Sequence, residues 1–226
     1  TPAAVVLQVP KKINNWAFET VPQPGLGGRK GYQPRGKVLG GSSSINAMAY
    51  IRGHRMDYDE WASLGNSGWS YDEVLPYFKR AEDNRRLKDA FHGQGGPLVV
   101  SDLQTDNPFQ QHYLDAAKQV GYPISTDFNG AEQEGVGLYQ VTQENGERWS
   151  SYRGYIKPHL DTRSNLRVET DAQTQRILFE GKRAVGVEYR QGGRLQTVMA
   201  RKEVILCAGA FQSPQLLMLS GIGDAA

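Results

Sequence analysis

The chain of 226 residues has little or none of several features that define common protein classes. Its single cysteine, Cys207, excludes an internal disulfide, and no metal-ligand spacing occurs among cysteine and histidine. No apolar run approaches the roughly 18 residues that a membrane-spanning helix needs. The 26 basic and 24 acidic residues are interleaved, so neither a charged tail nor nucleic-acid binding is predicted. Cys207 is expected to be a small buried strand residue rather than a reactive thiol.

The sequence has enough apolar material for a core, because hydrophobic residues make up 38% of it and charged residues 22%. Helical spacing and capping residues predict helices at residues 42–51, 56–64, 70–80, 107–120, 152–160 and 215–220. Short alternating or continuous apolar runs predict strands at residues 96–102, 136–143, 166–170, 174–179, 184–190, 194–200 and 203–208. Ser42 and Ser213 are the expected N-caps of the first and last helices. The pattern indicates a mixed chain in which an antiparallel meander precedes one buried parallel strand.

A glycine–serine segment follows an irregular, proline- and glycine-rich stretch at residues 20–36. Gly40 and Gly41 lie between an apolar pair and the first expected helix. Paired glycines let the backbone approach a ligand closely, and the start of a helix favours an anion such as a pyrophosphate. On its own, however, Gly-Gly-Ser is more typical of a plain turn before a capped helix.

Over its full length, from Gly36 to Gly53, the segment reads GKVLGGSSSINAMAYIRG, and it closely resembles a signature of the glucose-methanol-choline (GMC) oxidoreductase family. The string GAFQSPQLLMLSGIG, from Gly209 to Gly223, resembles the second signature of that family, and the distance between the two strings fits. Weaker likenesses extend from about Asn15 to the end of the chain. Within the family, the chain looks most like bacterial FAD-dependent alcohol and choline dehydrogenases.

The resemblance implies a set of FAD-binding positions near the first signature. The residues expected to face the pyrophosphate are Arg35, Gly40, Gly41, Ser42 and Ser43. Those expected to line the isoalloxazine ring are Asn46, Ala47, Met48 and Ala49. Their amide or backbone donors would stabilise charge at the N5 and O4 edge of the ring. Without the resemblance, Asn46 reads as a helix-surface amide, and Met48 and Ala49 as core residues.

Further positions follow from the same resemblance. Thr174 is expected to contact the adenine through its backbone, and Ala208 and Gly209 to approach the adenosine half. Ile45 stands where some choline-oxidising relatives have a histidine joined covalently to FAD. Because isoleucine has no nucleophile, non-covalent FAD is expected. The string at residues 148–151, which matches another recurring family motif, is expected to position a sheet rather than to touch a ligand.

The fold implied by the resemblance is α/β, of mixed α+β type. It comprises the central part of an FAD-binding Rossmann-like domain with an antiparallel β-meander, and part of an α+β substrate domain. The expected division is residues 1–95 in the FAD-binding domain, 96–150 in the substrate-binding domain and 151–226 in the FAD-binding domain. The GxGxxG turn that opens these enzymes is absent from the chain, as is the terminal segment with the catalytic histidine. The chain is therefore expected to be an interior fragment, inactive alone and without a catalytic residue of its own.

For the complete enzyme, the resemblance implies oxidation of the CH–OH group of a primary aliphatic alcohol to the aldehyde, by hydride transfer to flavin N5. Choline is the alternative substrate, although no aromatic cage for its cation can be placed. The expected electron acceptor is a quinone or another carrier in preference to oxygen. The corresponding location is the cytoplasm, with peripheral association at the inner membrane.

Two readings from other classes stay open. One is an FAD-containing hydroxynitrile lyase, which cleaves cyanohydrins without net redox change. The other is a non-catalytic isolated fragment that binds no flavin. A nicotinamide-linked Rossmann enzyme is disfavoured because no dinucleotide fingerprint is present.

Overall fold

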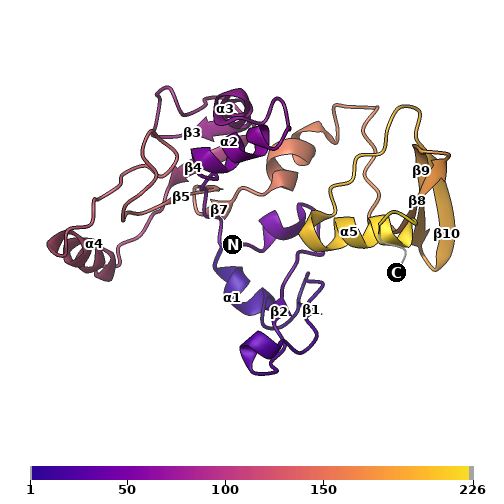
Figure 1. Cartoon of the computed structure of the whole chain (residues 1–226), viewed down its shortest axis with the longest axis horizontal. Helices are drawn as coiled ribbons and strands as arrows, with labels where there is room; N and C mark the ends of the chain where they lie inside the picture. The colour runs from indigo at the N-terminus through magenta and orange to yellow at the C-terminus, as the bar shows by residue number, and fades with distance from the viewer. Residues whose placement is uncertain (1, 224–226) are drawn as a thin grey trace. The chain divides into compact units, whose positions relative to one another are not determined.

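The computed structural model describes residues 2–223, and the chain divides into two compact units, Thr1–Leu166 and Arg167–Ala226. Both units combine helices with small sheets, so the predicted mixed α/β class is confirmed (Figure 1). Among the described residues, no helix is long and apolar enough to cross a membrane.

The first unit contains short helices and short strands joined by long loops. Its α-helices are α1 (Val5–Gln8), α2 (Arg55–Ser63), α3 (Tyr71–Ala81) and α4 (Phe109–Gln119). Its 3₁₀ and π turns are η1 (Pro2–Ala4), η2 (Pro24–Leu26), η3 (Gly41–Ser44), η4 (Tyr152–Ile156) and η5 (Lys157–His159). Its strands are β1 (Phe18–Glu19), β2 (Tyr32–Gln33), β3 (Glu82–Asn84), β4 (Leu98–Asp102), β5 (Gln140–Val141), β6 (Gln143–Glu144) and β7 (Glu147–Arg148).

Helices α2 and α3 begin at residues whose side chains cap them. His54 Nδ1 accepts the Met56 N–H at 3.2 Å at the start of α2. At the start of α3, the Glu73 carboxylate accepts from both the N–H and the hydroxyl of Ser70. Helix α3 continues through Pro76 and packs on α2 around a buried cluster. That cluster consists of Tyr58, Tyr71 and Val74, with Leu75 and Phe78 against it.

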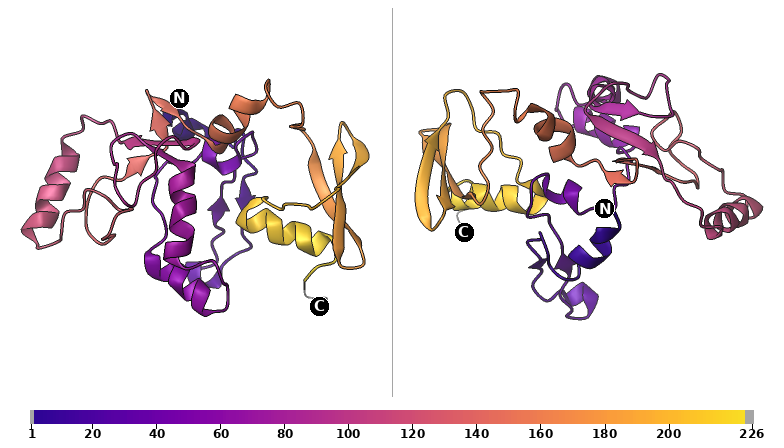
Figure 2. Two further views of the ribbon diagram at one scale, coloured as in Figure 1. Left: turned by 90° about the horizontal axis from the view of Figure 1, so that it is seen from above. Right: turned by 180° about the vertical axis from the view of Figure 1, so that it is seen from behind.

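The central sheet of this unit has the order β3-β4-β5. β3 and β4 are parallel, with Glu82 opposite Leu98, and β4 and β5 are antiparallel. Val99, Val100 and Val141 are almost completely buried in it. Helix α4 lies apart from α2 and α3 in all three ribbon views (Figures 1 and 2).

Three predictions for this unit are wrong in detail. The helix expected at residues 42–51 is only the turn η3, and its N-cap is Gly40 rather than Ser42. The reason is that Asn46 Oδ1 takes the Met48 N–H and Met48 has a φ of 64°, which no right-handed helix accommodates. The strand expected at 136–143 shrinks to β5 and β6, and residues 152–160 form π and 3₁₀ turns with Pro158 inside η5.

The second unit is an antiparallel meander with one helix. Its strands are β8 (Gln173–Glu180), β9 (Arg183–Gln191) and β10 (Arg194–Met199), paired in the order β10-β9-β8. Helix α5 (Gly209–Leu219) packs on β8, where the Ile177 N–H donates to Ser220 Oγ at 2.8 Å. Figure 2 shows the helix beside the strands. The predicted meander is confirmed.

The remaining predictions for the second unit need correction. Residues 166–170 and 203–208 form no strand, because no described strand offers them a hydrogen-bonding neighbour. Cys207, expected to be buried in such a strand, is consequently exposed. Helix α5 begins at Gly209, so Ser213 lies inside it and is not its N-cap. Instead, Ser213 Oγ accepts the Ala208 N–H at 3.1 Å.

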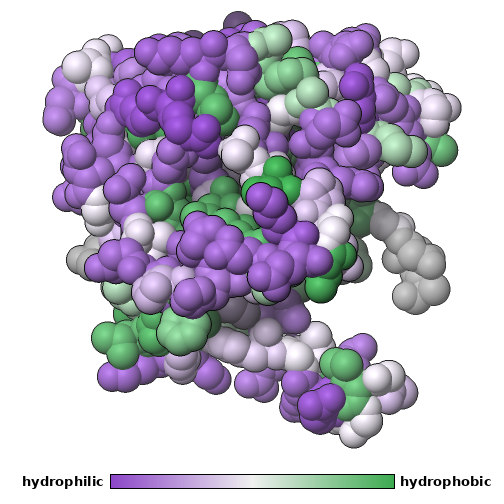
Figure 3. All heavy atoms as spheres, turned by 90° about the vertical axis from the view of Figure 1, so that its left-hand side faces the viewer, coloured by the Kyte–Doolittle hydropathy of each residue, from purple (hydrophilic) through white to green (hydrophobic). Residues whose placement is uncertain are grey.

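Large apolar side chains are exposed on both units. Hydrophobic patches interrupt the hydrophilic surface on the face shown in Figure 3. The most exposed members include Phe109 and Tyr113 on α4, and Ile205 and Met218 in the second unit. Apolar surface of this extent is typical of regions that contact other protein.

Candidate functional site

The glycine–serine turn is closed on one side and open on the other. A Cβ on Gly36 would stand 2.1 Å from the Gly41 carbonyl oxygen, so only glycine fits there. Gly40 and Gly41 have φ of 87° and 54°, which costs other residues about 1–2 kcal/mol. A Cβ on Gly40 would meet Ser44 Oγ at 2.5 Å, but one on Gly41 would meet nothing within 4 Å. The Gly41 N–H donates to the Val38 carbonyl at 2.8 Å, so what the turn leaves open to a ligand is the space beside the Gly41 Cα.

The three serines after Gly41 differ in what they can donate. Ser43 and Ser44 donate their hydroxyl protons to carbonyl oxygens of the same turn, at 2.5 and 2.8 Å. Ser42 Oγ instead accepts the Gly36 N–H at 3.1 Å. Within the described part of the chain, Ser42 is the serine of this turn whose hydroxyl proton is not already used, and it is exposed.

Arg35 precedes the turn and is half-buried. Its backbone N–H donates to Asn15 Oδ1 at 2.9 Å, and Asn15 Nδ2 donates to the Tyr32 hydroxyl at 2.8 Å. Arg35 Nη1 donates to the Pro34 carbonyl at 2.6 Å. These contacts fix the position of a cation directly before Gly36.

Residues 148–151 hold the turn from behind. The Ser151 N–H donates to Ser43 Oγ at 2.9 Å, and Ser151 Oγ donates to the Gly40 carbonyl at 3.2 Å. Arg148 Nη1 donates to Asn46 Oδ1 at 2.7 Å. The sequence indicated a sheet-positioning role for this string, and its contacts with the turn appear only in the fold.

The side-chain oxygen of Asn46 accepts hydrogen bonds within the chain, whereas its side-chain nitrogen donates none to the described residues. Its Oδ1 accepts from the Met48 N–H at 3.0 Å and from Arg148 Nη1. Its Nδ2 forms no hydrogen bond with the described residues, and the residue is exposed. Because Arg148 binds only the oxygen side, the amide is held with its two N–H donors free for a ligand.

The residues on either side of Asn46 alternate between buried and exposed. Ile45 and Met48 are 5% and 8% exposed, whereas Ala47 and Ala49 lie at the surface. The Met48 carbonyl accepts the Thr142 N–H at 2.9 Å. Of the four predicted ring-lining residues, Met48 therefore packs inward with its backbone N–H and carbonyl both hydrogen-bonded, while the two alanines leave room for a flat ligand.

In the second unit, the predicted residues occupy the meander and the start of α5. Thr174 lines a cavity of about 570 Å³ on the sheet, together with Val187 and Tyr189. Ala208 is the N-cap of α5. Gly209 is the first residue of the helix, with a φ of 88° and no atom within 4 Å of a built Cβ.

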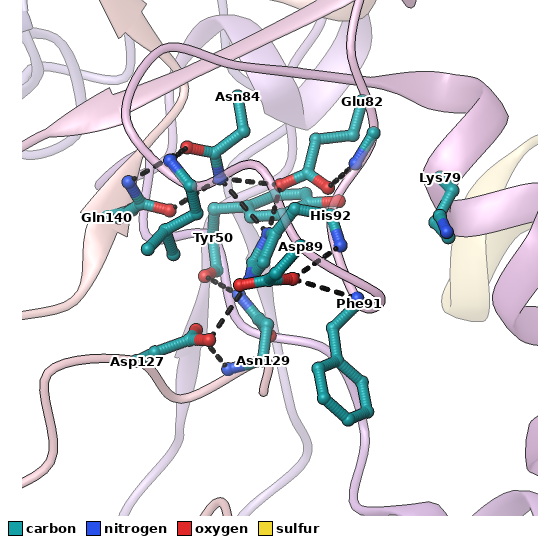
Figure 4. Close-up of polar contacts among 12 residues, drawn as sticks. Tyr50, Lys79, Glu82, Asn84, Asp89, Phe91, His92, Asp127, Asn129 and Gln140 are labelled. Carbon is teal, nitrogen blue, oxygen red and sulfur yellow. Dashed lines mark hydrogen bonds and ion pairs between the residues drawn. The ribbon is translucent and has the colours of Figure 1, made fainter. Parts of the chain in front are cut away.

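A buried polar cluster in the first unit was not found from the sequence. His92 lies between two carboxylates, with Nδ1 3.0 Å from Glu82 Oε1 and Nε2 3.0 Å from Asp127 Oδ2 (Figure 4). Glu82 also accepts from Arg52 Nη2 at 2.7 Å and from Asn84 Nδ2 at 2.8 Å. The members are scattered between residues 52 and 140, so no sequence spacing reveals that they meet.

Asp89, His92 and Asp127 are near enough to one another for a metal ion to be considered. Their hydrogen bonds argue against that use. Both ring nitrogens of His92 lie 3.0 Å from carboxylate oxygens, and a nitrogen that donates to such an oxygen has no lone pair for a metal. Asp89 Oδ1 meanwhile accepts the backbone N–H groups of Phe91 and His92.

Solved structures with this fold are enzymes that carry out oxidations. Pyridoxine 4-oxidase from Mesorbium loti superposes with a TM-score of 0.91 at 33% identity, covering 98% of this chain and 43% of that one. Formate oxidase from Aspergillus oryzae RIB40 superposes with a TM-score of 0.86 at 27% identity, covering 98% of this chain and 40% of that one. The fold therefore places this chain in the class of cofactor-binding oxidoreductases.

The family follows from the sequence comparison. The GMC oxidoreductase family model matches residues 17–226, and the chain belongs to that family. Mouse mitochondrial choline dehydrogenase is 48% identical over 99% of this chain and 37% of its own length. The oxygen-dependent choline dehydrogenase of Brucella anthropi is 46% identical over 100% of this chain and 41% of its own length. The chain thus spans about two-fifths of the length of these relatives.

Proposed function

We propose that the protein containing this chain is an FAD-dependent oxidoreductase that oxidises the CH–OH group of a primary alcohol to the aldehyde. The observation that carries the proposal is the turn at residues 36–49, which is open at Gly41 and has free amide donors on Asn46, in a chain of the GMC family. FAD bound there would supply the acceptor for the hydrogen that leaves the carbinol carbon as hydride.

In this proposal, the pyrophosphate end is bound by the turn. The positive charge of Arg35 and the hydroxyl proton of Ser42 suit an anion, and the open space beside the Gly41 Cα lets it approach. Gly40 and Ser43 shape the turn, because the Ser43 hydroxyl is used on the Gly40 carbonyl. For the adenosine half, we propose Thr174 beside its cavity, and the backbone of Ala208 and Gly209 at the start of α5.

The flavin ring is proposed to lie against residues 46–49. Asn46 Nδ2 would donate to the ring edge that gains negative charge, as an oxyanion hole does. Ala47 and Ala49 would offer small contact surfaces, and Met48, buried between them with a φ of 64°, would set the direction of the backbone. Non-covalent binding is supported by Ile45, which is buried and has no reactive atom.

Choline is the substrate that we favour, since both sequence relatives described above are named choline dehydrogenases. Choline is itself a primary alcohol, so it falls within the proposed reaction class. The acceptor proposed here is a quinone or a similar carrier, and a lipid-soluble quinone would bring the protein to the surface of the inner membrane. Oxygen is the competing acceptor, as in the name of the Brucella relative.

The test uses the whole protein, purified with its bound flavin and kept free of oxygen. We expect choline or an aliphatic primary alcohol to bleach the visible absorption of the flavin, with the aldehyde as product. Comparing choline with its uncharged isostere, in which carbon replaces the nitrogen, decides whether the cation is recognised. A yellow protein whose flavin stays oxidised with all alcohols would overturn the proposal and favour the lyase.

Re-oxidation of the bleached protein identifies the acceptor. We expect a soluble quinone analogue to restore the oxidised spectrum much faster than air does. Faster recovery in air would instead identify an oxidase.

A further inference from the structure

His92 is held as a cation by its geometry. Its side chain is 0% exposed, and each ring nitrogen lies 3.0 Å from a carboxylate oxygen, of Glu82 on one side and Asp127 on the other (Figure 4). Asn84 Nδ2 also lies 3.2 Å from Nδ1, but it bonds Glu82 Oε1 and Gln140 Oε1 at the shorter distances of 2.8 and 2.7 Å. Because ionised carboxylates only accept hydrogen bonds, the geometry points to a proton on each ring nitrogen, that is, to an imidazolium. Burial alone would lower the pKa of His92, but the hydrogen bonds from Asp127 and Glu82 outweigh it and raise that pKa to about 9.

The charges around the ring balance. The cations are His92 and Arg52 and the anions are Glu82 and Asp127; Asp127 is half-buried and the other three are buried. The pKa of each carboxyl is lowered by its hydrogen bond from His92 against the opposing effect of burial. The other groups facing the cluster lie at its rim. They are the Asp89 carboxylate, bonded to backbone N–H groups, the Tyr50 hydroxyl, whose pKa burial raises, and the Asp102 carboxylate, which accepts from Gln140 Nε2.

This cluster is joined to the segment that follows the proposed flavin contacts. Asp127 Oδ1 accepts the Asn129 N–H at 2.9 Å, and the Asn129 side chain bonds both the Arg52 N–H, at 2.8 Å, and the Tyr50 carbonyl, at 3.0 Å. On the other side, the Tyr50 N–H donates to the Gln140 carbonyl at 2.9 Å.

A second connection joins Glu82 to Gln140, the residue that accepts the Tyr50 N–H, through the side chain of Asn84. Asn84 Nδ2 bridges Glu82 Oε1 at 2.8 Å and Gln140 Oε1 at 2.7 Å. Arg52 adds a third connection, with Nη2 on Glu82 and Nη1 on the Phe91 carbonyl at 2.8 Å. Residues 50–52 are therefore held on both sides by groups that bond to the two carboxylates on His92.

We propose that His92, as an imidazolium between Glu82 and Asp127, is a positioning residue that fixes residues 46–52 against the flavin. The inference rests on the proposed function. Loss of one ring proton would place a nitrogen lone pair 3.0 Å from a carboxylate oxygen, and that side of the clamp would open. The displacement passes through Asn129 or Asn84 to residues 50–52, and from there to Asn46–Ala49.

The most specific variant is Asp127→Asn in the whole flavin-loaded protein. It keeps the oxygen that accepts the Asn129 N–H but puts an amide nitrogen where Oδ2 faces His92. Since a donor there favours a ring nitrogen without a proton, we expect the imidazolium to lose its proton at lower pH. The companion variant is His92→Gln, and the matched control is His112→Gln, on the exposed face of α4.

Two readouts are measured against pH. The first is the visible circular dichroism of the bound flavin, which reports the surroundings of the ring without turnover. We expect a transition near pH 9 in the wild type and in His112→Gln, at least one unit lower in Asp127→Asn, and absent in His92→Gln. The second is the rate of anaerobic flavin reduction by alcohol, which we expect to fall roughly tenfold to hundredfold in His92→Gln, with alcohol affinity little changed.

The outcomes separate this inference from the proposed function. An alkaline transition that stays in place in Asp127→Asn overturns the inference, as does an unchanged reduction rate in His92→Gln. A wild-type flavin that no alcohol reduces overturns the proposed function, while the dichroism still decides the role of His92. If His92→Gln does not fold, ¹⁵N resonances of the wild-type ring at neutral pH serve instead: two protonated nitrogens support the clamp, and one overturns it.

Discussion

Asn46 is the residue that we propose to donate to the flavin ring. Arg148 and the Met48 N–H occupy its oxygen, so the function of the side chain depends on which atoms remain on the other side of the amide. The amide is therefore a fixed donor rather than a rotating one. Two other single residues carry predictions. Ile45 predicts how the flavin is held, and His92 predicts how stability changes with pH.

Replacing Asn46 with aspartate tests the donor. Asn46→Asp keeps the size and the contact with Arg148 but replaces both N–H donors by an oxygen with negative charge. We expect anaerobic flavin reduction to slow by roughly 10²-fold or more, because removing one hydrogen-bond donor to a developing negative charge slows a reaction by that factor. Asn107→Asp, at the exposed start of α4, is the control that should keep the wild-type rate. A wild-type rate in Asn46→Asp would show that the Asn46 amide takes no part in flavin reduction.

The side chain at position 45 predicts how the flavin is held. Ile45 is 5% exposed and has no nucleophilic atom. Acid denaturation of the whole protein should therefore release all of the yellow colour into the supernatant. Colour that stays with the precipitated polypeptide would show a covalent bond elsewhere in the protein.

His92 also makes stability depend on pH. Its pKa is raised from 6.5 to about 9, so the stabilisation is complete below about pH 6.5 and is lost as the pH rises to about 9. The contribution of His92 to the free energy of unfolding that is lost over this range is on the order of 3 kcal/mol. The thermal midpoint of the protein should fall over this range, and His92→Gln should start lower and fall less. Parallel slopes in the two proteins would be inconsistent with a buried imidazolium.

At the scale of elements, the local capping signal predicted the start of α3, whereas the expected caps Ser42 and Ser213 were wrong. Ser70 and Glu73 mark the start of α3, and the helix forms there despite Pro76. The segment after Gly41 carries an equally helical pattern, yet Asn46 turns its amide onto the Met48 N–H and Tyr50 pairs with Gln140. Such competition between distant partners and a local helix is not visible in one sequence. The His92 cluster was missed for the same reason.

The glycine turn can be tested as an element by comparing two positions. Gly36→Ala would push a Cβ against backbone at 2.1 Å, so we expect a loss of about 3 kcal/mol and poor flavin retention. Gly41→Ala meets no atom within 4 Å and should cost only about 1 kcal/mol from its positive φ. It should nevertheless weaken FAD binding, because its methyl group would stand where the ligand approaches. Urea unfolding and flavin titration of both variants measure the two effects, and tight FAD binding by Gly41→Ala would contradict the open-cradle assignment.

At the scale of the whole molecule, the family and the fold class were predictable because two long signatures lie in order along the chain. The division into units was harder to predict, since the meander and α5 form a separate unit from residue 167 onward. The chain spans about two-fifths of the length of its relatives, so substrate choice and the proton acceptor depend on the whole protein.

The most direct measurement of the central claim is the structure of the whole protein with its cofactor bound. We predict that the isoalloxazine ring lies on residues 46–49, with Asn46 Nδ2 within hydrogen-bonding distance of its N5 and O4 edge and Gly41 backbone beside the pyrophosphate. A flavin ring bound against a different segment, with the Asn46 amide directed away from it, would contradict the account.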